Sequence, residues 1–403
     1  MASRAGWLEG LQARGAALAG RLAWPTTQEE EWRRTSLTGL KLDEVPEVEP
    51  DGHGPEPAAD LEAGQAGAAR FRGVTCTGIG LAAEWRDRGV VLARIAAGDP
   101  VPEPVAALVE SALARADNRL AAWHLGSLSH GALLYVPRGV AMSGPVIVDL
   151  EEDAAAASFP HLTVVLERGA RAVVVQRLAG TGALVNAGVD VQVGEAASLE
   201  LYQLQDLGLR SLYFSHSSAI VARDARFRSL ETHLGGRLVK TRMDCSLEGP
   251  GAESYLNGAF LAGGGQHMDL RTVQRHRSPK ALSRALYKGA VKDSGRTVYQ
   301  GLIEVSPGAS GTDAYLSNKN LLLNDGARAD SIPSLRIDNN DVRCSHGSTT
   351  GRINPEEMFY LAARGLAPAE ARAMLVLGYF EELLAGAPFA VEALERVSGR
   401  LAG

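Results

Sequence analysis

A two-residue turn signal recurs through the middle of the chain and constrains its fold more than any other feature. Each copy adjoins an apolar, strand-like stretch, and the copies are Gly169-Ala170, Glu195-Ala196, Asp224-Ala225, Gly251-Ala252, Gly308-Ala309 and Gly326-Ala327. Several neighbouring copies are 26 to 29 residues apart, while one interval is about twice as long and the last is 18. A repeat of this length, with one coil per repeat, is typical of a β-solenoid.

The composition between these turns favours the same architecture. Glycine supplies 45 of the 403 residues, without a collagen period, which indicates many tight turns. Few helix signals interrupt residues 121–350, so parallel strands there would lack the crossover helices of an ordinary α/β fold. A stack of some nine or ten coils is therefore favoured over a β-sandwich. In Val239 to Leu247, alternation predicts a core face containing Met243 and Cys245 and a solvated face containing Lys240 and Arg242.

The chain divides into three predicted parts. Residues 1–120 are expected to be mainly helical, with an acidic linker at 41–68, and residues 121–352 to form the solenoid core. Residues 353–403 are expected to form a helical domain, because Pro355 and Pro368 each suit the first turn of a helix. The second of these helices carries an apolar stripe that we predict to bind a partner: Met374, Leu377, Phe380 and Leu384.

Charge and motifs exclude several classes of function. A net charge of −6 gives no basis for binding nucleic acid, and no apolar stretch reaches the ~20 residues needed to span a bilayer. The three cysteines, Cys76, Cys245 and Cys344, are too few for a disulfide framework and fit a reducing, cytoplasmic setting. The chain lacks a phosphate-binding P-loop and the common zinc and redox motifs, so it is not expected to be an enzyme or to bind a cofactor tightly.

One segment, residues 338–347, contains several side chains that could bind a metal ion. Cys344 and His346 are two residues apart, so on an extended strand they project from the same face as a possible pair of metal ligands. Val342 shares that face, and the pattern alone favours the simpler interpretation that both residues belong to the core. Just upstream, Asp338 and Asp341 fit either a turn or the acidic site of a β-helical carbohydrate-active enzyme, which is the alternative function. Two ligands cannot hold a metal tightly, so such a site would need ligands from another chain.

The run Cys344-Ser345-His346-Gly347, within the stretch from Asn324 to Gly351, is the most specific motif in the chain. Through it the chain strongly resembles the SufB/SufD family of iron–sulfur cluster assembly proteins. Supporting stretches are Glu31-Trp32-Arg33, Asn257-Gly258, Ser283 to Gly289, Gln300-Gly301, Phe359-Tyr360-Leu361 and Arg364-Gly365. The match covers roughly residues 120–385.

The resemblance implies a right-handed parallel β-helix with helical ends that acts as a non-catalytic scaffold. It implies pairing with a SufB-type subunit (or a homodimer in isolation) and binding of a SufC-type ATPase by the C-terminal helices. A transient iron or iron–sulfur cluster would form at the subunit interface, with His346 as the first candidate ligand and Cys344 as the second. SufB-type proteins carry a cysteine just before the stretch matching Leu321-Leu322-Leu323, where this chain reads Ser317-Asn318-Lys319-Asn320. They also carry a glutamate where this chain has Gly347, so the resemblance is to the SufD branch.

Overall fold

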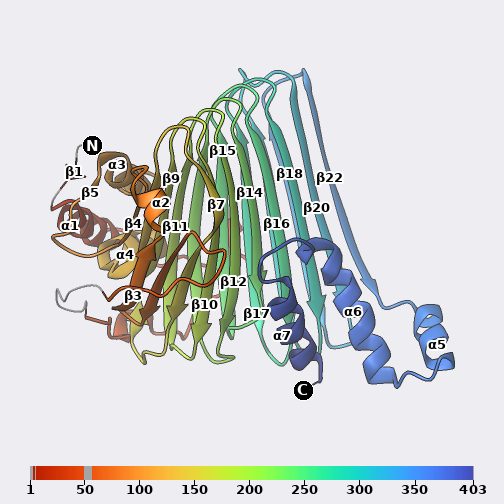
Figure 1. The fold of residues 1–403 in the computed structure, drawn as a ribbon. Coiled ribbons are helices and arrows are strands. Elements are labelled where there is room, and N and C mark those ends of the chain that lie inside the picture. The colour runs from red at the N-terminus through yellow and green to blue at the C-terminus, as the bar shows by residue number, and fades with distance from the viewer. Residues whose placement is uncertain (1–2, 5, 50–56, 403) are drawn as a thin grey trace.

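The computed structural model describes residues 3–4, 6–49 and 57–402. About 46% of the chain is strand, and most strands belong to a parallel β-helix of about 8 turns (Figure 1). The predicted fold class is confirmed, with helices at both ends. The coils are slightly fewer than expected, because the later ones are longer than the spacing of the turn signals suggests.

Each coil gives one strand to each of two sheets. Sheet 1 contains β3 (Thr75–Leu81), β2 (Gly67–Arg72), β7 (Ala141–Glu151), β10 (Arg171–Gly180), β12 (Ser198–Leu207), β14 (Arg226–His233), β16 (Glu253–Ala262), β18 (Leu282–Val291), β20 (Thr312–Leu322) and β22 (Val342–Arg352). Sheet 2 contains β4 (Val91–Arg94), β6 (His130–Val136), β8 (Ala157–Ser158), β9 (Pro160–Leu166), β11 (Leu184–Val193), β13 (Leu212–Val221), β15 (Leu238–Leu247), β17 (His267–His276), β19 (Arg296–Val305) and β21 (Arg328–Ile337).

The recurring turn forms one corner of the coil. In most copies a residue in the left-handed region precedes a buried alanine, as in Gly169-Ala170 and Asp224-Ala225. The second copy is shifted by one residue, to Ala196-Ala197, and Gly308 before the buried Ala309 is not left-handed. The copy missing from the sequence pattern is Lys280-Ala281, where a lysine takes the left-handed conformation at φ 57°. Gly326-Ala327 precedes β21 and therefore belongs to a different corner, which explains why the last interval is short.

The strand pairing shows how the coil length changes along the rod. The paired residues Gln176 and Gln203, on β10 and β12, are 27 residues apart in the sequence. The paired residues Tyr287 and Asn318, on β18 and β20, are 31 residues apart. The coils therefore lengthen by a few residues toward the C-terminal end.

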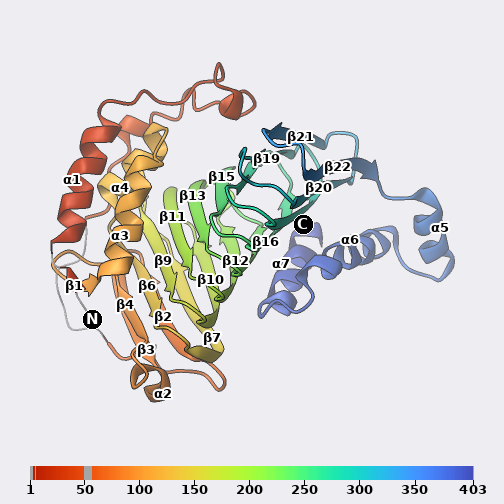
Figure 2. The same cartoon turned by 90° about the horizontal axis from the view of Figure 1, so that it is seen from above.

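The interior of the coils is the main hydrophobic core. Val239, Met243 and Cys245 of β15 are at most 1% exposed there, as predicted. The other face of β15 differs from the prediction, because Lys240 and Arg242 are also buried. A segment that we name the N-terminal strap, residues 30–45, covers them. Figure 2 shows it leaving α1 (Trp7–Ala19) and running outward along sheet 2.

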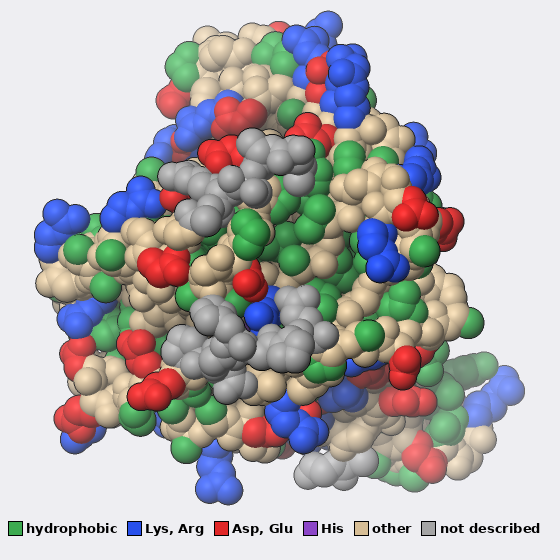
Figure 3. Space-filling view, turned by 60° about the vertical axis from the view of Figure 1, so that its left-hand side comes forward, with side chains coloured by type: hydrophobic (Ala, Val, Ile, Leu, Met, Phe, Trp, Pro, Cys, Tyr) green, Lys and Arg blue, Asp and Glu red, His purple; other side chains and the backbone are tan. Residues whose placement is uncertain are grey.

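The interior of the β-helix is covered at its N-terminal end. Trp85 of the short helix α2 (Ala83–Arg86) is 4% exposed and packs into the interior core. The edge of β3 is covered by residues 57–59, since Ile79 donates to the carbonyl of Pro57 at 2.9 Å and accepts from Ala59 at 3.1 Å. Other elements around this end are β1 (Ser3–Arg4), β5 (Val101–Pro102), α3 (Glu103–Ser111), α4 (Arg119–Ser127) and the 3-10 turns η1 (Glu30–Trp32), η2 (Leu42–Glu44) and η3 (Ala112–Ala114). On the face shown in Figure 3, acidic and basic side chains are interspersed around hydrophobic ones.

The C-terminal helices are α5 (Pro355–Ala363), α6 (Pro368–Leu384) and α7 (Ala390–Ala402). Helices α6 and α7 lie over the outer face of sheet 1 (Figure 1) and bury a second apolar cluster with residues such as Leu204, Leu230 and Leu261. Helix α5 has no buried residue and stands away from the body in Figures 1 and 2. No helix among the described residues is long and apolar enough to cross a membrane.

Candidate functional site

The last coil leaves the C-terminal end of the β-helix open. Among the described strands, β22 pairs only with β20, and β21 pairs only with β19. Their outer backbone N–H and C=O groups therefore form two free sheet edges, which can pair with another chain. Leu335 and Ile337 of β21 are 39% and 37% exposed here, because no further coil covers them. Apolar side chains and unpaired edges in one place are typical of a protein interface.

Cys344 and His346 lie on this open coil. Cys344 pairs with Ala314 and His346 pairs with Leu316, and both partners belong to the interior core. Paired residues in a parallel sheet point to the same side of the sheet. Cys344 and His346 therefore point toward the interior of the β-helix, at its uncovered C-terminal end. Cys344 is half-buried against the core, whereas His346 is exposed. The structure thus brings the pair together on one face and makes it accessible from outside.

The surroundings of Cys344 favour the protonated form of its thiol by raising its pKa. Burial raises the pKa of Cys344 above its usual value, and the nearby carboxylate of Asp313 acts in the same direction. A neighbouring imidazolium would favour the thiolate, but His346 is not among the groups that influence this pKa. An incoming metal ion would have to displace the proton, as thiolate ligation requires.

The pair is not a complete metal site within the part of the chain that the structure describes. Among the described residues, no group of three or more His, Cys, Asp or Glu side chains is arranged to hold a metal ion. A cysteine and a histidine are suitable ligands for iron or an iron–sulfur cluster, so their chemistry fits such a group. The remaining ligands would have to come from a chain docked on the open end.

The structure also shows where Cys245 and the pair Asp338 and Asp341 lie. Cys245 is fully buried in the interior, and burial raises its pKa to about 12, so it is a core residue as predicted. Asp338 and Asp341 lie in the turn between β21 and β22, where the Asn339 side chain donates to the Pro307 carbonyl at 2.6 Å and accepts from the Asp341 N–H. This supports the turn interpretation over the carbohydrate-active alternative.

The predicted partner-binding stripe on α6 faces this chain instead of solvent. Phe380 and Leu384 are at most 1% exposed in the cluster against sheet 1, and Leu377 packs against the same cluster. Only Met374 is exposed, at 52%. Helical periodicity identified the apolar face correctly, but the outer face of sheet 1 covers it. The exposed large side chains nearby are those of Phe359 and Tyr360 on α5, at 76% and 57%.

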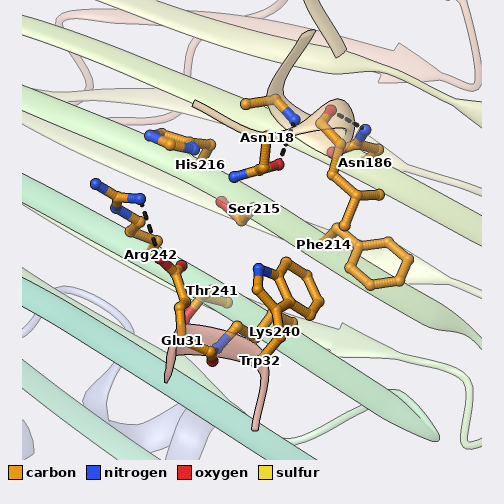
Figure 4. Close-up of a pocket in the computed structure, with 12 residues that line it drawn as sticks. Glu31, Trp32, Asn118, Asn186, Phe214, Ser215, His216, Lys240, Thr241 and Arg242 are labelled. Carbon is orange, nitrogen blue, oxygen red and sulfur yellow. Dashed lines mark hydrogen bonds and ion pairs between the residues drawn. The ribbon is translucent and has the colours of Figure 1, made fainter. Parts of the chain in front are cut away.

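A buried polar network beneath the N-terminal strap was not predicted (Figure 4). Lys240 Nζ donates to the Glu31 carbonyl at 2.9 Å, lies 2.9 Å from the Asp269 carboxylate and faces the Trp32 ring at 5.1 Å. Arg242 binds Glu31 at 3.1 Å and, at 2.8–2.9 Å, two aspartates. The alternation of charges in β15 was visible in the sequence, but Glu31 of the strap lies 209 residues before Lys240.

Two histidines that are far apart in the sequence also meet on sheet 2. His124 of α4 and His161 of β9 are 2.9 Å apart at their ring nitrogens, and His161 faces Asp190 at 3.4 Å. The contact requires Gly188, because a Cβ atom there would lie 2.3 Å from His124 Nε2. Burial lowers the pKa of His124 to about 3. With its hydrogen bond to the Asn186 carbonyl at 2.7 Å, the histidine fixes α4 to the sheet.

Comparison with known proteins agrees with this geometry. The family model described as "SUF system FeS cluster assembly, SufBD core domain" matches residues 148–379, from β7 into α6. A SufBD family protein of Mycobacterium tuberculosis is 34% identical over 277 residues, covering 66% of this chain and 70% of that protein. The counterpart from Mycobacterium leprae is 32% identical over 276 residues, with 66% and 70% covered. The iron–sulfur cluster assembly protein SufD of Escherichia coli is 33% identical over 216 residues, covering 53% of this chain and 51% of that protein.

Proposed function

This chain belongs to the SufBD family of the SUF iron–sulfur cluster assembly system, and from that premise we propose that it is a non-catalytic, SufD-like scaffold subunit. In this proposal it pairs with a SufB-type subunit through the open end of its β-helix and binds a SufC-type ATPase through its C-terminal helices. It works in the cytoplasm and contributes ligands to a nascent cluster, which is the cargo of the complex.

The observation that carries the proposal is the position of Cys344 and His346 on the uncovered last coil. A strand in the middle of the β-helix would have both edges paired and its inward side chains sealed. Strand β22 has a free edge, half-exposed apolar neighbours and two ligand-type side chains at the mouth of the interior. A second β-helix docked edge to edge would cover the apolar mouth and bring further ligands to it.

The ATPase is assigned to the exposed side of α5 and α6. Phe359, Tyr360 and Met374 are large apolar side chains that this chain leaves in solvent, and exposed aromatic residues are enriched among the residues that dominate binding energy. Helix α6 is tied to the β-helix by Lys288, which is 1% exposed and donates to the Tyr379 carbonyl at 3.0 Å. Movement of a bound ATPase would therefore be transmitted to sheet 1 through α6.

Co-purification tests the proposal. The full chain is produced with a SufB-type and a SufC-type protein, as wild type and as His346→Ala, Cys344→Ala and the control Ser345→Ala. We expect all four to elute as one complex by size-exclusion chromatography. Bound iron and visible absorbance should fall most in His346→Ala, less in Cys344→Ala, and stay at the wild-type level in Ser345→Ala.

The two parts of the proposal fail separately. Elution of the chain apart from both partners would overturn the scaffold function. A complex that forms normally and loads the wild-type amount of iron in His346→Ala would overturn only the ligand role of the histidine.

A further inference from the structure

A hollow of about 190 Å³ lies on the outer face of sheet 2, close to the open end. Its floor consists of neighbouring positions on β17, β19 and β21, with the strap residue Glu30 at one side. The side chains used below are those of Arg271, Gln300, Leu302, Ile332, Ser334 and Arg336. None of them belongs to the Cys344–His346 site.

Arg271 lines this hollow with unused hydrogen-bonding capacity. Its Nε atom is buried and, within the part of the chain that the structure describes, has no hydrogen-bond partner. The nearest carboxylate to its guanidinium is that of Glu31, which lies 3.6 Å from Nη1, beyond the range of a hydrogen bond. The adjacent Arg242 has carboxylate partners at 2.8, 2.9 and 3.1 Å. A buried guanidinium N–H without an acceptor is costly, so an acceptor is expected at this position.

Arg336 lines the hollow from β21, and its charge is only weakly compensated. Its side chain is 64% exposed, and its contact with the Glu304 carboxylate is long, at 3.5 Å. The same carboxylate is contacted by Arg277 at 3.2 Å and by Arg275 at 3.7 Å. Arg275 also contacts Asp244, at 2.9 Å, so Arg277 and Arg336 are the two guanidinium groups that depend on Glu304, and the positive charge beside the hollow is only partly compensated.

The other lining groups are compatible with an anion. The Glu30 carboxylate is paired with Arg33 at 2.8 Å, so its negative charge is largely compensated. Leu302 and Ile332 supply an apolar floor, and a less polar surrounding strengthens the attraction between a guanidinium and an anion. The Ser334 hydroxyl is a further hydrogen-bond donor beside Arg336.

We propose that this hollow is a binding site for a small oxyanion, with a carboxylate or phosphate group held between Arg271 and Arg336. The planar fork of a guanidinium matches two oxygens of either group. The site lies outside the cluster-assembly role proposed above and does not depend on it.

Calorimetric titration of the full chain at low salt tests the site, with inorganic phosphate and with malonate as the two probes. We expect saturable one-site binding of at least one probe, weakened about tenfold or more in Arg271→Gln and in Arg336→Gln, because each removes a charge-assisted hydrogen bond. Arg271→Lys keeps the charge but not the fork and should also weaken binding. The matched control is Arg277→Gln, which removes the same charge from the shared Glu304 without lining the hollow.

Phosphate binding alone would assign a phosphate ligand, and malonate binding alone a carboxylate. The proposal is overturned if neither probe saturates the protein, or if Arg277→Gln weakens binding as much as the two lining variants. Thermal melting of each variant checks that it is folded. Arg336→Gln changes an exposed side chain, so it remains informative if Arg271→Gln disturbs the strap.

Discussion

Replacing Phe380 by alanine tests whether this residue binds a partner or instead fixes α6 to sheet 1 of the same chain. Phe380 is 1% exposed and packs with Leu230, Ala259 and other outer-face residues of sheet 1. An aromatic side chain buries roughly 150–250 Å², which at about 25 cal/mol per Å² corresponds to ~4–6 kcal/mol. Because alanine keeps the Cβ and neighbours relax partly, we expect Phe380→Ala to cost about 3–5 kcal/mol.

The matched variant is Met374→Ala on the same helix. Met374 is 52% exposed, so its truncation should change the free energy of unfolding by no more than ~0.5 kcal/mol. It should instead weaken binding of the SufC-type ATPase, which isothermal titration with the purified ATPase measures.

Helices α6 and α7 form a unit on one face, and such a unit can open without global unfolding. Native-state hydrogen exchange of the amides in residues 368–402 is therefore the decisive assay, alongside urea denaturation followed by circular dichroism. Phe380→Ala should speed exchange throughout α6 and α7, while Met374→Ala should not. Unchanged protection in Phe380→Ala, together with lost ATPase binding, would refute the packing argument and restore the predicted partner-binding stripe.

Two further predictions concern the interior and the buried histidines. Gly258→Ala should cost about 3 kcal/mol or more in urea denaturation, because its Cβ would lie 2.2 Å from the Tyr287 ring, whose hydroxyl donates to the buried Glu231 at 2.6 Å. Gly378→Ala, with no atom within 4 Å of the added Cβ, should cause no loss; equal losses in both would contradict the steric argument. Burial lowers the pKa of His276 to about 4 and that of His124 to about 3, against about 6.5 in the unfolded chain. The folded chain therefore binds fewer protons below pH 6.5, so the unfolding free energy should fall between about pH 6.5 and 4. That slope should be smaller in His276→Gln, and an unchanged slope would show that this histidine stays charged when folded.

The repeat could be predicted from the sequence because each coil must turn at the same corner. Glycine and aspartate tolerate the left-handed conformation and mark that corner visibly, whereas Lys280 adopts the same conformation without any sequence signal. The alanine after it is the more constant feature, since its small side chain fits the buried corner, as at Ala225 and Ala252. The true coil length is therefore recovered only when the strands are paired.

The sequence predicted which residues of the candidate site share a face, but it did not predict what each face contacts. Alternation placed Cys344 and His346 on one face, and the resemblance pointed to the same residues. What a face contacts is a long-range property, so periodicity could not show that sheet 1 covers Phe380 or that the strap covers Lys240. The Arg271 hollow was also invisible, because its lining residues come from three coils and the strap.

The difference between the two ends of the β-helix limits how far the molecule can assemble. A rod with free strand edges at both ends could add copies without end and grow into a fibre. Here Trp85 covers the interior at one end, and residues 57–59 obstruct the addition of a strand to β3 of sheet 1. Within the described residues, sheet 1 can therefore be extended by a further strand at β22 but is obstructed at β3.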